Sequence, residues 1–417
     1  MNARERALLA AVRLPTQKRF EVEESLDELA RLAESAGAQV VGRVTQERKA
    51  PTPGLYFGKG KVDELKGFSQ REGANLMISD DALSPIQERN LGGSLGMKVI
   101  DRTALILDIF AQRARTMEGK LQVELAQLSY LLPRLVGQWR HLERLGGGIG
   151  TRGPGETQLE SDRRIIRHRI QKLRDELARV RVHRRLVRDR RKATGYPVVA
   201  LVGYTNAGKT TLLNRLTGSD RTAADRLFVT LDPAARMVAA GPHAPFILTD
   251  TVGFIRKLPT QLVAAFKATL EELTEADVLV HVVDASHPGL DEQMAAVEAL
   301  LAELGLADRP TIIALNKTDL TEGGPALERL VDHCQGVAVS ARTGQGIEDL
   351  LDRIEHTLRP RVSRAALKIP YQDGTALAQC YERGRVISRR DEADGIRIEV
   401  ELPQRFLRPL APYLEPA

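Results

Sequence analysis

The stretch Gly203-Tyr204-Thr205-Asn206-Ala207-Gly208-Lys209-Thr210 (GYTNAGKT) decides the fold. It follows the apolar run PVVALV and opens the segment KTTLLNRLTG, so the sequence predicts a strand, a glycine-rich loop and a helix in that order. In such a loop the backbone N–H groups curl around a phosphate, the lysine adds positive charge, and the following hydroxyl can coordinate Mg²⁺. We therefore predict a P-loop in which Lys209 contacts the phosphate oxygens and Thr210 coordinates Mg²⁺.

The sequence around this loop alternates strand-like and helix-like segments. The apolar runs PVVALVG, PFILTD, DVLVHVVDA, PTIIALN and GVAVS are separated by amphipathic stretches between residues 196 and 358. Strands that are apolar along their whole length are typical of a parallel sheet that is buried on both faces. We predict a Ras-like, doubly wound α/β domain.

A second motif selects the base. Asn316-Lys317-Thr318-Asp319 directly follows the strand-like PTIIAL. The Asp319 carboxylate can accept both N–H groups of the guanine edge, where adenine presents the wrong pattern, and an unmatched buried polar edge costs several kcal/mol. Ser340-Ala341-Arg342, after GVAV, fits the loop that closes over the base. These residues predict a guanine nucleotide.

Two further segments fit the switches of a GTPase. In Asp250-Thr251-Val252-Gly253 (DTVG), the aspartate would bind Mg²⁺ through water and the glycine N–H would meet the γ-phosphate. LFVTLDP lies between this turn and the P-loop, and its Thr230 is the candidate for a second Mg²⁺ hydroxyl ligand. Because all five elements occur in GTPase order, we predict a GTPase.

One position departs from the Ras pattern. A glutamine that orients the attacking water follows the switch glycine in Ras-type GTPases, whereas this chain has Phe254 there. A phenylalanine side chain neither donates nor accepts a hydrogen bond. We therefore expect slow hydrolysis by the free protein and help from a partner surface. An alternative source of help is a K⁺ ion held by Asn206, as in related GTPases that carry a P-loop asparagine.

The remaining sequence predicts three more domains. Residues 1–112 alternate strand and helix patterns, which indicates a small parallel α/β domain. Leucines at steps of three and four recur twice within 113–194, which predicts a long antiparallel helical hairpin with a glycine-rich turn, its first helix kinked at Pro133. The GTPase domain is assigned to 195–360. Residues 361–417 are expected to form a small α+β domain, with strands read in ALAQCYERGRVISRR and GIRIEVELP.

Composition points to a polyanionic partner. The formal charge is +6, and residues 163–192 carry fourteen Arg or Lys against three Asp or Glu. A strong excess of positive charge on a projecting hairpin favours contact with the phosphates of structured RNA, as does the glycine-rich GGGIGTRGPGE (146–156), which contains Arg152.

The two cysteines are far apart in sequence, which indicates a reducing compartment, and no apolar run approaches the ~20 residues of a membrane span. We expect a cytoplasmic monomer.

The chain resembles the HflX family of ribosome-associated GTPases. The resemblance rests on GKGKVDEL, DRTALILDIFAQRARTMEGKLQVELAQLSYLLPRL and GGGIGTRGPGETQLE, together with the GTPase motifs. It implies binding of GTP and GDP, of the 50S ribosomal subunit and of the 70S ribosome through rRNA, and the GTP-dependent splitting of 70S ribosomes under stress. Lys209, Thr230, Gly253 and Asn206 would be catalytic, and Thr210, Thr230 and, through water, Asp250 would hold Mg²⁺. The implied nucleotide contacts are Gly203, Tyr204, Thr205, Asn206, Ala207, Gly208, Lys209, Thr210, Phe228, Val229, Thr230, Leu231, Asp232, Asp250, Thr251, Val252, Gly253, Asn316, Lys317, Thr318, Asp319, Ser340, Ala341 and Arg342.

Two alternatives remain open from the sequence. The same GTPase chemistry suits a ribosome-assembly or RNA-modification GTPase that acts on rRNA or tRNA. The other alternative is an RNA-binding protein with a vestigial nucleotide site, which the intact Lys209, Thr210 and Asp319 disfavour.

Overall fold

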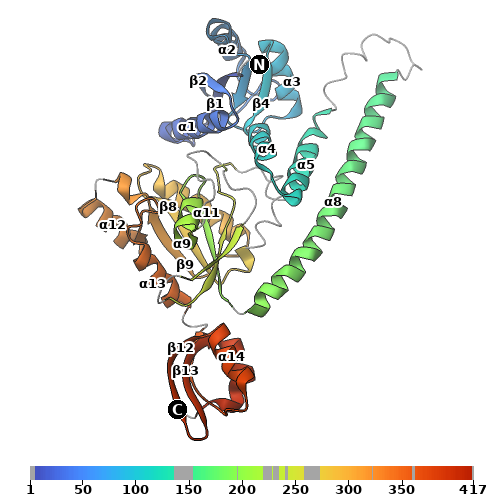
Figure 1. Ribbon diagram of the computed structural model, residues 1–417. Coiled ribbons are helices and arrows are strands. Elements are labelled where there is room, and N and C mark those ends of the chain that lie inside the picture. The colour runs from blue at the N-terminus through green and yellow to red at the C-terminus, as the bar shows by residue number, and fades with distance from the viewer. Residues whose placement is uncertain are drawn as a thin grey trace. The chain divides into compact units, whose positions relative to one another are not determined.

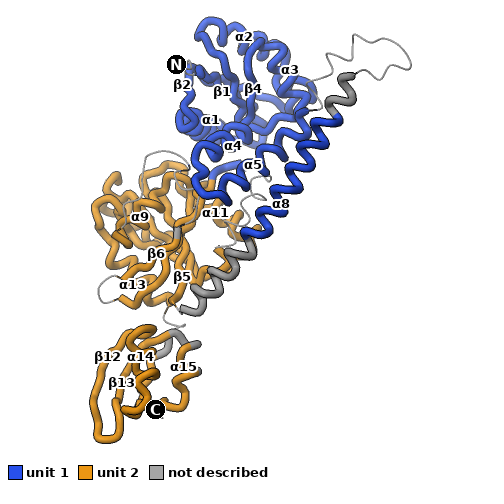
Figure 2. Tube along the Cα trace, turned by 45° about the vertical axis from the view of Figure 1, so that its right-hand side comes forward, with its two compact units in different colours: residues 1–180, 224–232, 255–267 blue, residues 181–223, 233–254, 268–417 orange. Residues whose placement is uncertain are grey.

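The computed structural model describes residues 5–135, 154–194, 196–218, 228, 234–239, 243–257, 273–321, 323–358 and 362–415. The chain divides into two compact units (Figure 2). The first contains residues 1–180, 224–232 and 255–267, and the second contains residues 181–223, 233–254 and 268–417. Each unit therefore includes segments that are distant in sequence.

A parallel sheet forms the centre of the first unit. Its described strands pair in the order β2-β1-β3-β4. They are β1 (Arg6–Arg13), β2 (Gln39–Glu47), β3 (Leu76–Ser79) and β4 (Lys98–Asp101), and the helices between them are α1 (Arg19–Ser35), α2 (Lys59–Glu72) and α3 (Pro85–Leu95). Strand order reverses between β1 and β3, so the carboxyl ends of these strands border the crevice where doubly wound sheets place polar sites.

Local sequence explains where these helices begin and end. The Ser84 hydroxyl accepts a hydrogen bond from the Gln87 N–H at the start of α3, and Pro85 occupies the first helical position. Gly96 ends the helix with φ of 68°, a conformation that glycine adopts without strain. Ser84 and Pro85 therefore fix where α3 begins, and Gly96 fixes where it ends before β4.

Two helices pack side by side, as the heptad pattern predicts (Figure 1). They are α5 (Met117–Leu131), which follows α4 (Arg102–Arg113), and α8 (Pro154–Thr194). Leu121, Leu125 and Leu128 of α5 cluster with Leu173 and Leu177 of α8. The Arg169 guanidinium binds both carboxylate oxygens of Glu124, at 2.7 and 2.8 Å.

The predicted kink at Pro133 coincides with an interruption of the helix. Helix α5 ends at Leu131, and residues 132–134 form a turn. Leu135 is helical again. Proline has no N–H to continue the helical ladder and its ring crowds the preceding turn, so the helix is interrupted here. Trp139, Leu142 and most of the glycine-rich stretch 146–156 lie outside the described residues.

The second unit contains the doubly wound sheet. Its described strands pair in the order β10-β9-β8-β5-β7-β6, and all pairs are parallel except β6 with β7. The strands are β5 (Val198–Gly203), β6 (Ala234–Val238), β7 (Phe246–Asp250), β8 (Val278–Asp284), β9 (Thr311–Asn316) and β10 (Val337–Ala338). The described helices are α9 (Lys209–Thr217), α11 (Leu290–Glu303), α12 (Pro325–Cys334), α13 (Ile347–Leu358) and the 3₁₀ turn η1 (Thr318–Leu320). The predicted Ras-like sheet is confirmed, and its apolar strands are buried.

The C-terminal residues of this unit form a three-stranded antiparallel sheet in the order β11-β13-β12. Its elements are β11 (Val362–Ile369), α14 (Gly374–Arg383), β12 (Arg385–Glu392), β13 (Gly395–Pro403), α15 (Gln404–Leu410) and the 3₁₀ turn η3 (Ala411–Tyr413). The α+β class is confirmed, but the strand expected in ALAQCYER is wrong, because this segment is α14. Asp373 caps that helix by accepting from the Ala376 N–H, and the buried Ala376 and Cys380 follow helical spacing.

No helix among the described residues combines the length and apolarity needed to cross a membrane.

Both cysteines, Cys334 and Cys380, are free thiols, and burial raises the pKa of Cys380 to about 11. A thiol that stays protonated in the core packs as a small apolar side chain.

Candidate nucleotide site

The P-loop begins where β5 ends. Gly203 has φ of 146°, and a Cβ at this position would lie 2.2 Å from the Val282 carbonyl oxygen of β8. Only glycine therefore lets the chain leave the sheet this close to the neighbouring strand. Helix α9 starts at Lys209, so the loop delivers its N–H groups to a helix N-terminus, where anions are favoured.

Two other P-loop residues take the left-handed conformation that the tight curve requires. Asn206 has φ of 63° and Gly208 has φ of 94°. Asparagine tolerates this region better than most residues. A Cβ on Gly208 would lie 2.2 Å from the Asn316 side-chain nitrogen, so the NKTD motif packs directly beneath the loop.

Lys209 is almost completely buried, at 6% exposure, and its ammonium group stays inside the loop. Its Nζ donates to the carbonyl oxygens of Gly203 and Tyr204, at 3.0 and 2.8 Å. Burial lowers the pKa of Lys209 to about 8, although the nearby Asp250 carboxylate acts in the opposite direction. A bound phosphate would add negative charge here and favour the ammonium form.

Thr210 and Asp250 meet at the end of β7. The Thr210 hydroxyl donates to the Asp250 carboxylate across 2.9 Å, and Asp250 has no exposed surface. Hydroxyl and carboxylate oxygens are the hard ligands that Mg²⁺ prefers, and Mg²⁺ sites of this kind draw their other ligands from waters and phosphates. The pair therefore fits Mg²⁺.

The turn after Asp250 packs against the P-loop. A Cβ on Gly253 would lie 2.7 Å from the Thr205 Cα and 3.0 Å from the Lys209 Nζ, so a larger residue requires the turn to move. Phe254 donates its N–H to the Gly203 carbonyl at 3.1 Å and accepts from the Thr205 N–H at 2.7 Å. Its ring is 3% exposed and so faces the protein interior. The residue that replaces glutamine thus holds the turn through its backbone.

The base-recognition residues form one network. The Asn316 side chain donates to the Ala207 carbonyl at 2.8 Å and accepts from the Ala341 N–H at 3.0 Å, which ties the P-loop to the SAR loop. The Ser340 hydroxyl donates to Asp319 at 2.6 Å and orients that carboxylate. The P-loop and the two motifs expected to bind guanine are therefore connected.

Lys317 and Arg342 have different surroundings. Lys317 has φ of 64°, and its Nζ pairs with Asp284 at 2.7 Å, which fixes the start of η1. The Arg342 side chain is 80% exposed. The Thr318 hydroxyl donates to the Val339 carbonyl.

Four of the expected contact residues, Val229, Thr230, Leu231 and Asp232, lie outside the described residues. Phe228, from the same motif, is described and belongs to the first unit. It is 2% exposed, and its ring makes an edge contact with Phe110 of α4, the centroids 4.6 Å apart. The proposed roles of Thr230 and its neighbours stay predictions.

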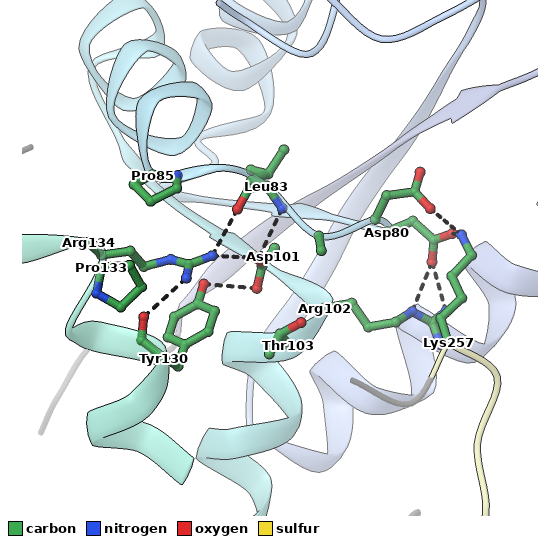
Figure 3. A pocket seen from close by; sticks show the side chains of 12 residues that line it. Asp80, Leu83, Pro85, Asp101, Arg102, Thr103, Tyr130, Pro133, Arg134 and Lys257 are labelled. Atoms are coloured by element: carbon green, nitrogen blue, oxygen red, sulfur yellow. Dashed lines mark hydrogen bonds and ion pairs between the residues drawn. The ribbon is translucent and has the colours of Figure 1, made fainter. Parts of the chain in front are cut away.

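The sequence reading missed a second polar site, in the first unit (Figure 3). A cavity of about 630 Å³ lies at the carboxyl ends of β3 and β4. Asp101 accepts from the Tyr130 hydroxyl and from Arg134, and Asp80 accepts from Arg102. The available signal was positional, because Asp80 and Asp101 each follow or close a short buried strand at the same edge of the sheet.

Sequence comparisons cover most of the chain. Residues 23–111 match the model of the GTP-binding GTPase N-terminal region, residues 113–191 the GTP-binding GTPase middle region, residues 198–317 the 50S ribosome-binding GTPase, and residues 326–410 the HflX C-terminal domain.

Curated relatives are similar along nearly their whole length. GTPase HflX of Caldanaerobacter subterraneus subsp. tengcongensis is 49% identical over 96% of this chain and 91% of its own length. GTPase HflX of Escherichia coli K12 is 45% identical over 96% of this chain and 94% of its own length.

Among solved structures, a GTP-binding protein from Sulfolobus solfataricus in complex with GDP is 27% identical. The match covers 85% of this chain and 99% of that chain, with a TM-score of 0.45.

The similarity to these relatives decides the family of the chain. The order of the GTPase motifs and the sheet that positions them agree with this family. The chain belongs to the HflX family of GTPases.

Proposed function

We propose that the site in the second unit binds GTP and hydrolyses it to GDP and phosphate. The observation that carries this proposal is the connection from the P-loop through Asn316 to the SAR loop, with Asp319 oriented by Ser340. In the proposal Lys209 and Gly253 contact the γ-phosphate, and Asp319 selects guanine. The remaining nucleotide contacts are those that the resemblance implies.

Mg²⁺ is proposed at the Thr210–Asp250 pair, with Thr230 as a further ligand. When bound, the ion would neutralise charge on the phosphate oxygens. K⁺ at Asn206 is proposed as one source of the help that Phe254 does not give. If turnover is equal in K⁺ and Na⁺, the K⁺ part of the proposal fails and a partner-supplied group remains.

The proposed client is the large ribosomal subunit, and the proposed outcome is the splitting of 70S ribosomes with GTP bound, followed by release on hydrolysis. Two observations support it. The model that matches residues 198–317 is described as a 50S ribosome-binding GTPase. Arg164, Arg167 and Arg174 are exposed on α8 at spacings of three and seven, which places them towards one side of the helix.

Sedimentation of 70S ribosomes through a sucrose gradient tests this proposal. We expect the protein with GTP, or with a non-hydrolysable analogue, to shift 70S particles into subunits, while GDP leaves them intact. Lys209→Ala should abolish the shift because the phosphate loses its cation. An unchanged shift with Lys209→Ala would overturn the proposal.

A ribosome-assembly or RNA-modification GTPase is the alternative. It predicts binding to immature particles or tRNA in the same gradients, with intact 70S unaffected. The proposal includes four domains, at residues 1–112, 113–194, 195–360 and 361–417. It also includes a monomeric state and a cytoplasmic location, where a ribosomal client would be met.

A further inference from the structure

Two pieces of the switch region belong to the first unit rather than to the unit that holds the P-loop (Figure 2). One contains Phe228, at the start of the segment with the Mg²⁺ candidate Thr230. The other begins at Ile255, the second residue after Gly253. The contacts of Phe228, Arg256 and Lys257 show what holds these pieces.

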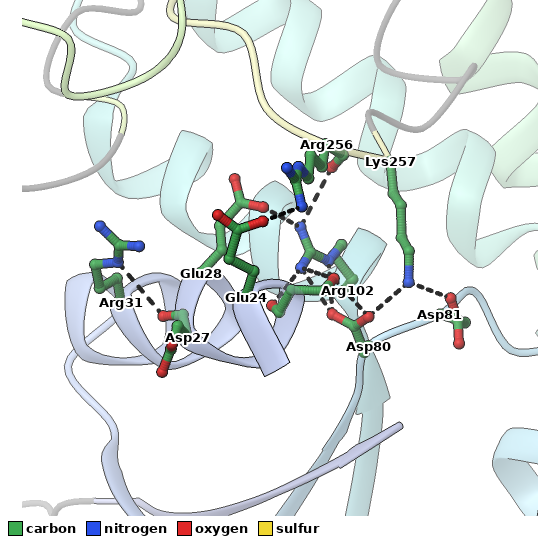
Figure 4. A network of polar contacts seen from close by, with 10 residues as sticks. Glu24, Asp27, Glu28, Arg31, Asp80, Asp81, Arg102, Arg256 and Lys257 are labelled. Carbon is green, nitrogen blue, oxygen red and sulfur yellow. Dashed lines mark hydrogen bonds and ion pairs between the residues drawn. The ribbon is translucent and has the colours of Figure 1, made fainter. Parts of the chain in front are cut away.

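Arg102 is the centre of a polar cluster in the first unit (Figure 4). This first residue of α4 is 2% exposed. Its guanidinium donates to Asp80 at 2.7 Å, to Glu28 at 3.2 Å and to the carbonyl oxygen of Arg256 at 3.3 Å. A buried arginine therefore binds the backbone three residues after the switch glycine.

Lys257 adds a second contact. Its Nζ donates to Asp80 at 2.6 Å and to Asp81 at 2.5 Å, and the residue itself has φ of 54°, an uncommon conformation for lysine. Burial opposes the ionisation of Asp80, but Arg102 and Lys257 outweigh it and hold the pKa of Asp80 below its ordinary value. Asp80 is thus a carboxylate shared between the first unit's own arginine and the lysine that follows the turn.

Arg256 makes the third contact, with Glu24 of α1 at 2.8 Å. The cluster then consists of four carboxylates, Glu24, Glu28, Asp80 and Asp81, and three cations. Two of the three cations, Arg256 and Lys257, come from the post-switch segment. Buried and half-buried carboxylates of like charge repel when their cations are removed, so this segment is needed to balance the cluster.

We propose that this cluster is a set of positioning residues for GTP hydrolysis, because it binds Arg256 and Lys257, which directly follow the switch turn in the chain. Phe254 gives no side chain to orient water, so hydrolysis depends on where the Gly253 backbone sits. Lys257 is four residues from Gly253, and a small displacement of a catalytic group costs a large factor in rate. The proposal rests on the proposed GTPase activity.

The test compares Lys257→Met with Lys257→Arg and with a matched control. Lys98→Met removes an exposed lysine of the same unit, paired with Glu5 at 3.0 Å and absent from the cluster. We expect Lys257→Met to lower kcat for GTP by about tenfold, with the KM for GTP and the Kd for GDP unchanged within about twofold. Lys257→Arg should retain most of the rate, and Lys98→Met all of it.

A double-mutant cycle with Asp81→Asn tests the contact itself. If the pair acts as one unit, the double variant is no slower than the slower single variant. Three results would overturn the inference. The rate losses of the two single variants could multiply in the double variant, Lys257→Met could hydrolyse GTP at the same rate as Lys98→Met, or Lys257→Met could be faster than the wild type. If the wild-type protein does not hydrolyse GTP with or without ribosomes, the proposed function fails instead, and the two failures are distinguishable.

Discussion

Phe254 holds the DTVG turn against the P-loop through its backbone and not through a polar side chain. Its ring is buried, while its N–H and carbonyl bond to Gly203 and Thr205 across the P-loop. A glutamine would have to leave this apolar environment to reach a water molecule. At the residue scale, the geometry of the turn therefore depends on backbone contacts and on the absence of a side chain at Gly253.

Gly253→Ala tests that dependence. The new Cβ would lie 2.7 Å from the Thr205 Cα, so the turn must move relative to the P-loop. We expect turnover to fall by about a hundredfold, with GDP affinity changed less than about threefold, because GDP has no γ-phosphate. Single-turnover hydrolysis and GDP titration measure the two effects. Near-normal turnover would show that the close packing is irrelevant to chemistry.

The lowered pKa of Lys209 leads us to expect a pH dependence of nucleotide binding. Burial lowers its pKa to about 8, and bound phosphates favour the charged form, so nucleotide binding above pH 8 requires uptake of a proton. We expect GDP affinity to be flat below about pH 8 and to weaken by about tenfold per pH unit above it. Titration with a fluorescent GDP checks this. A flat profile up to about pH 9.5 would contradict it.

At the scale of elements, the α5–α8 pair rests on a narrow apolar seam. Leu173 has no exposed surface and packs among Leu121, Leu125 and Leu128, while Arg169 clamps Glu124 beside them. Seven of the described α8 side chains between 163 and 179 are Arg or Lys, so few other apolar groups hold this helix. Among the described α8 side chains, the seam and Ile170 are the buried apolar groups.

Leu173→Ala should destabilise the protein by about 2–5 kcal/mol, since a cavity replaces a buried isobutyl group. Ile165→Ala is the matched control on the same helix. Ile165 is 64% exposed, so its loss should cost less than about 0.5 kcal/mol. Urea unfolding followed by circular dichroism measures both. Equal effects of the two substitutions would mean that the seam contributes nothing.

Sequence patterns located the regular elements well and the irregular ones less well. The strand-like runs and leucine spacings appear as strands and helices because burial enforces their periods. ALAQCYER reads as a strand at period two, yet the Asp373 cap and the buried Ala376 and Cys380 make it helical. Pro133 lies in the turn that interrupts the helix after Leu131, because proline lacks the N–H that the helical ladder needs.

At the scale of the whole molecule, the motifs of the proposed nucleotide site could be read from the sequence, whereas the residues that pack around them could not. The P-loop, NKTD and SAR residues are contiguous motifs, and the structure connects them through Asn316. The cluster at Arg102 joins residues from α1, the end of β3 and the post-switch segment. No spacing rule links such distant positions, so only the fold reveals it.

The exposed arginines of α8 give a prediction at this scale. Reversing charge at Arg164, Arg167 and Arg174 together should weaken ribosome binding by at least about tenfold at moderate salt, because each lost phosphate contact removes counterion release. The affinity for GDP should not change. Co-sedimentation with 50S subunits at several salt concentrations tests this. Unchanged binding with an unchanged salt slope would exclude this helix as the RNA contact.

The make-up of the first unit also bears on how the protein is synthesised. Its carboxylates Glu24, Asp80 and Asp81 leave the ribosome long before Arg256 and Lys257, which are their partners. At about 5–20 residues per second, the delay is on the order of ten seconds. During that interval the nascent first unit carries an unbalanced acidic edge. The chain therefore completes its N-terminal unit only after the P-loop and the switch turn have been translated, which links the maturation of the two units in time.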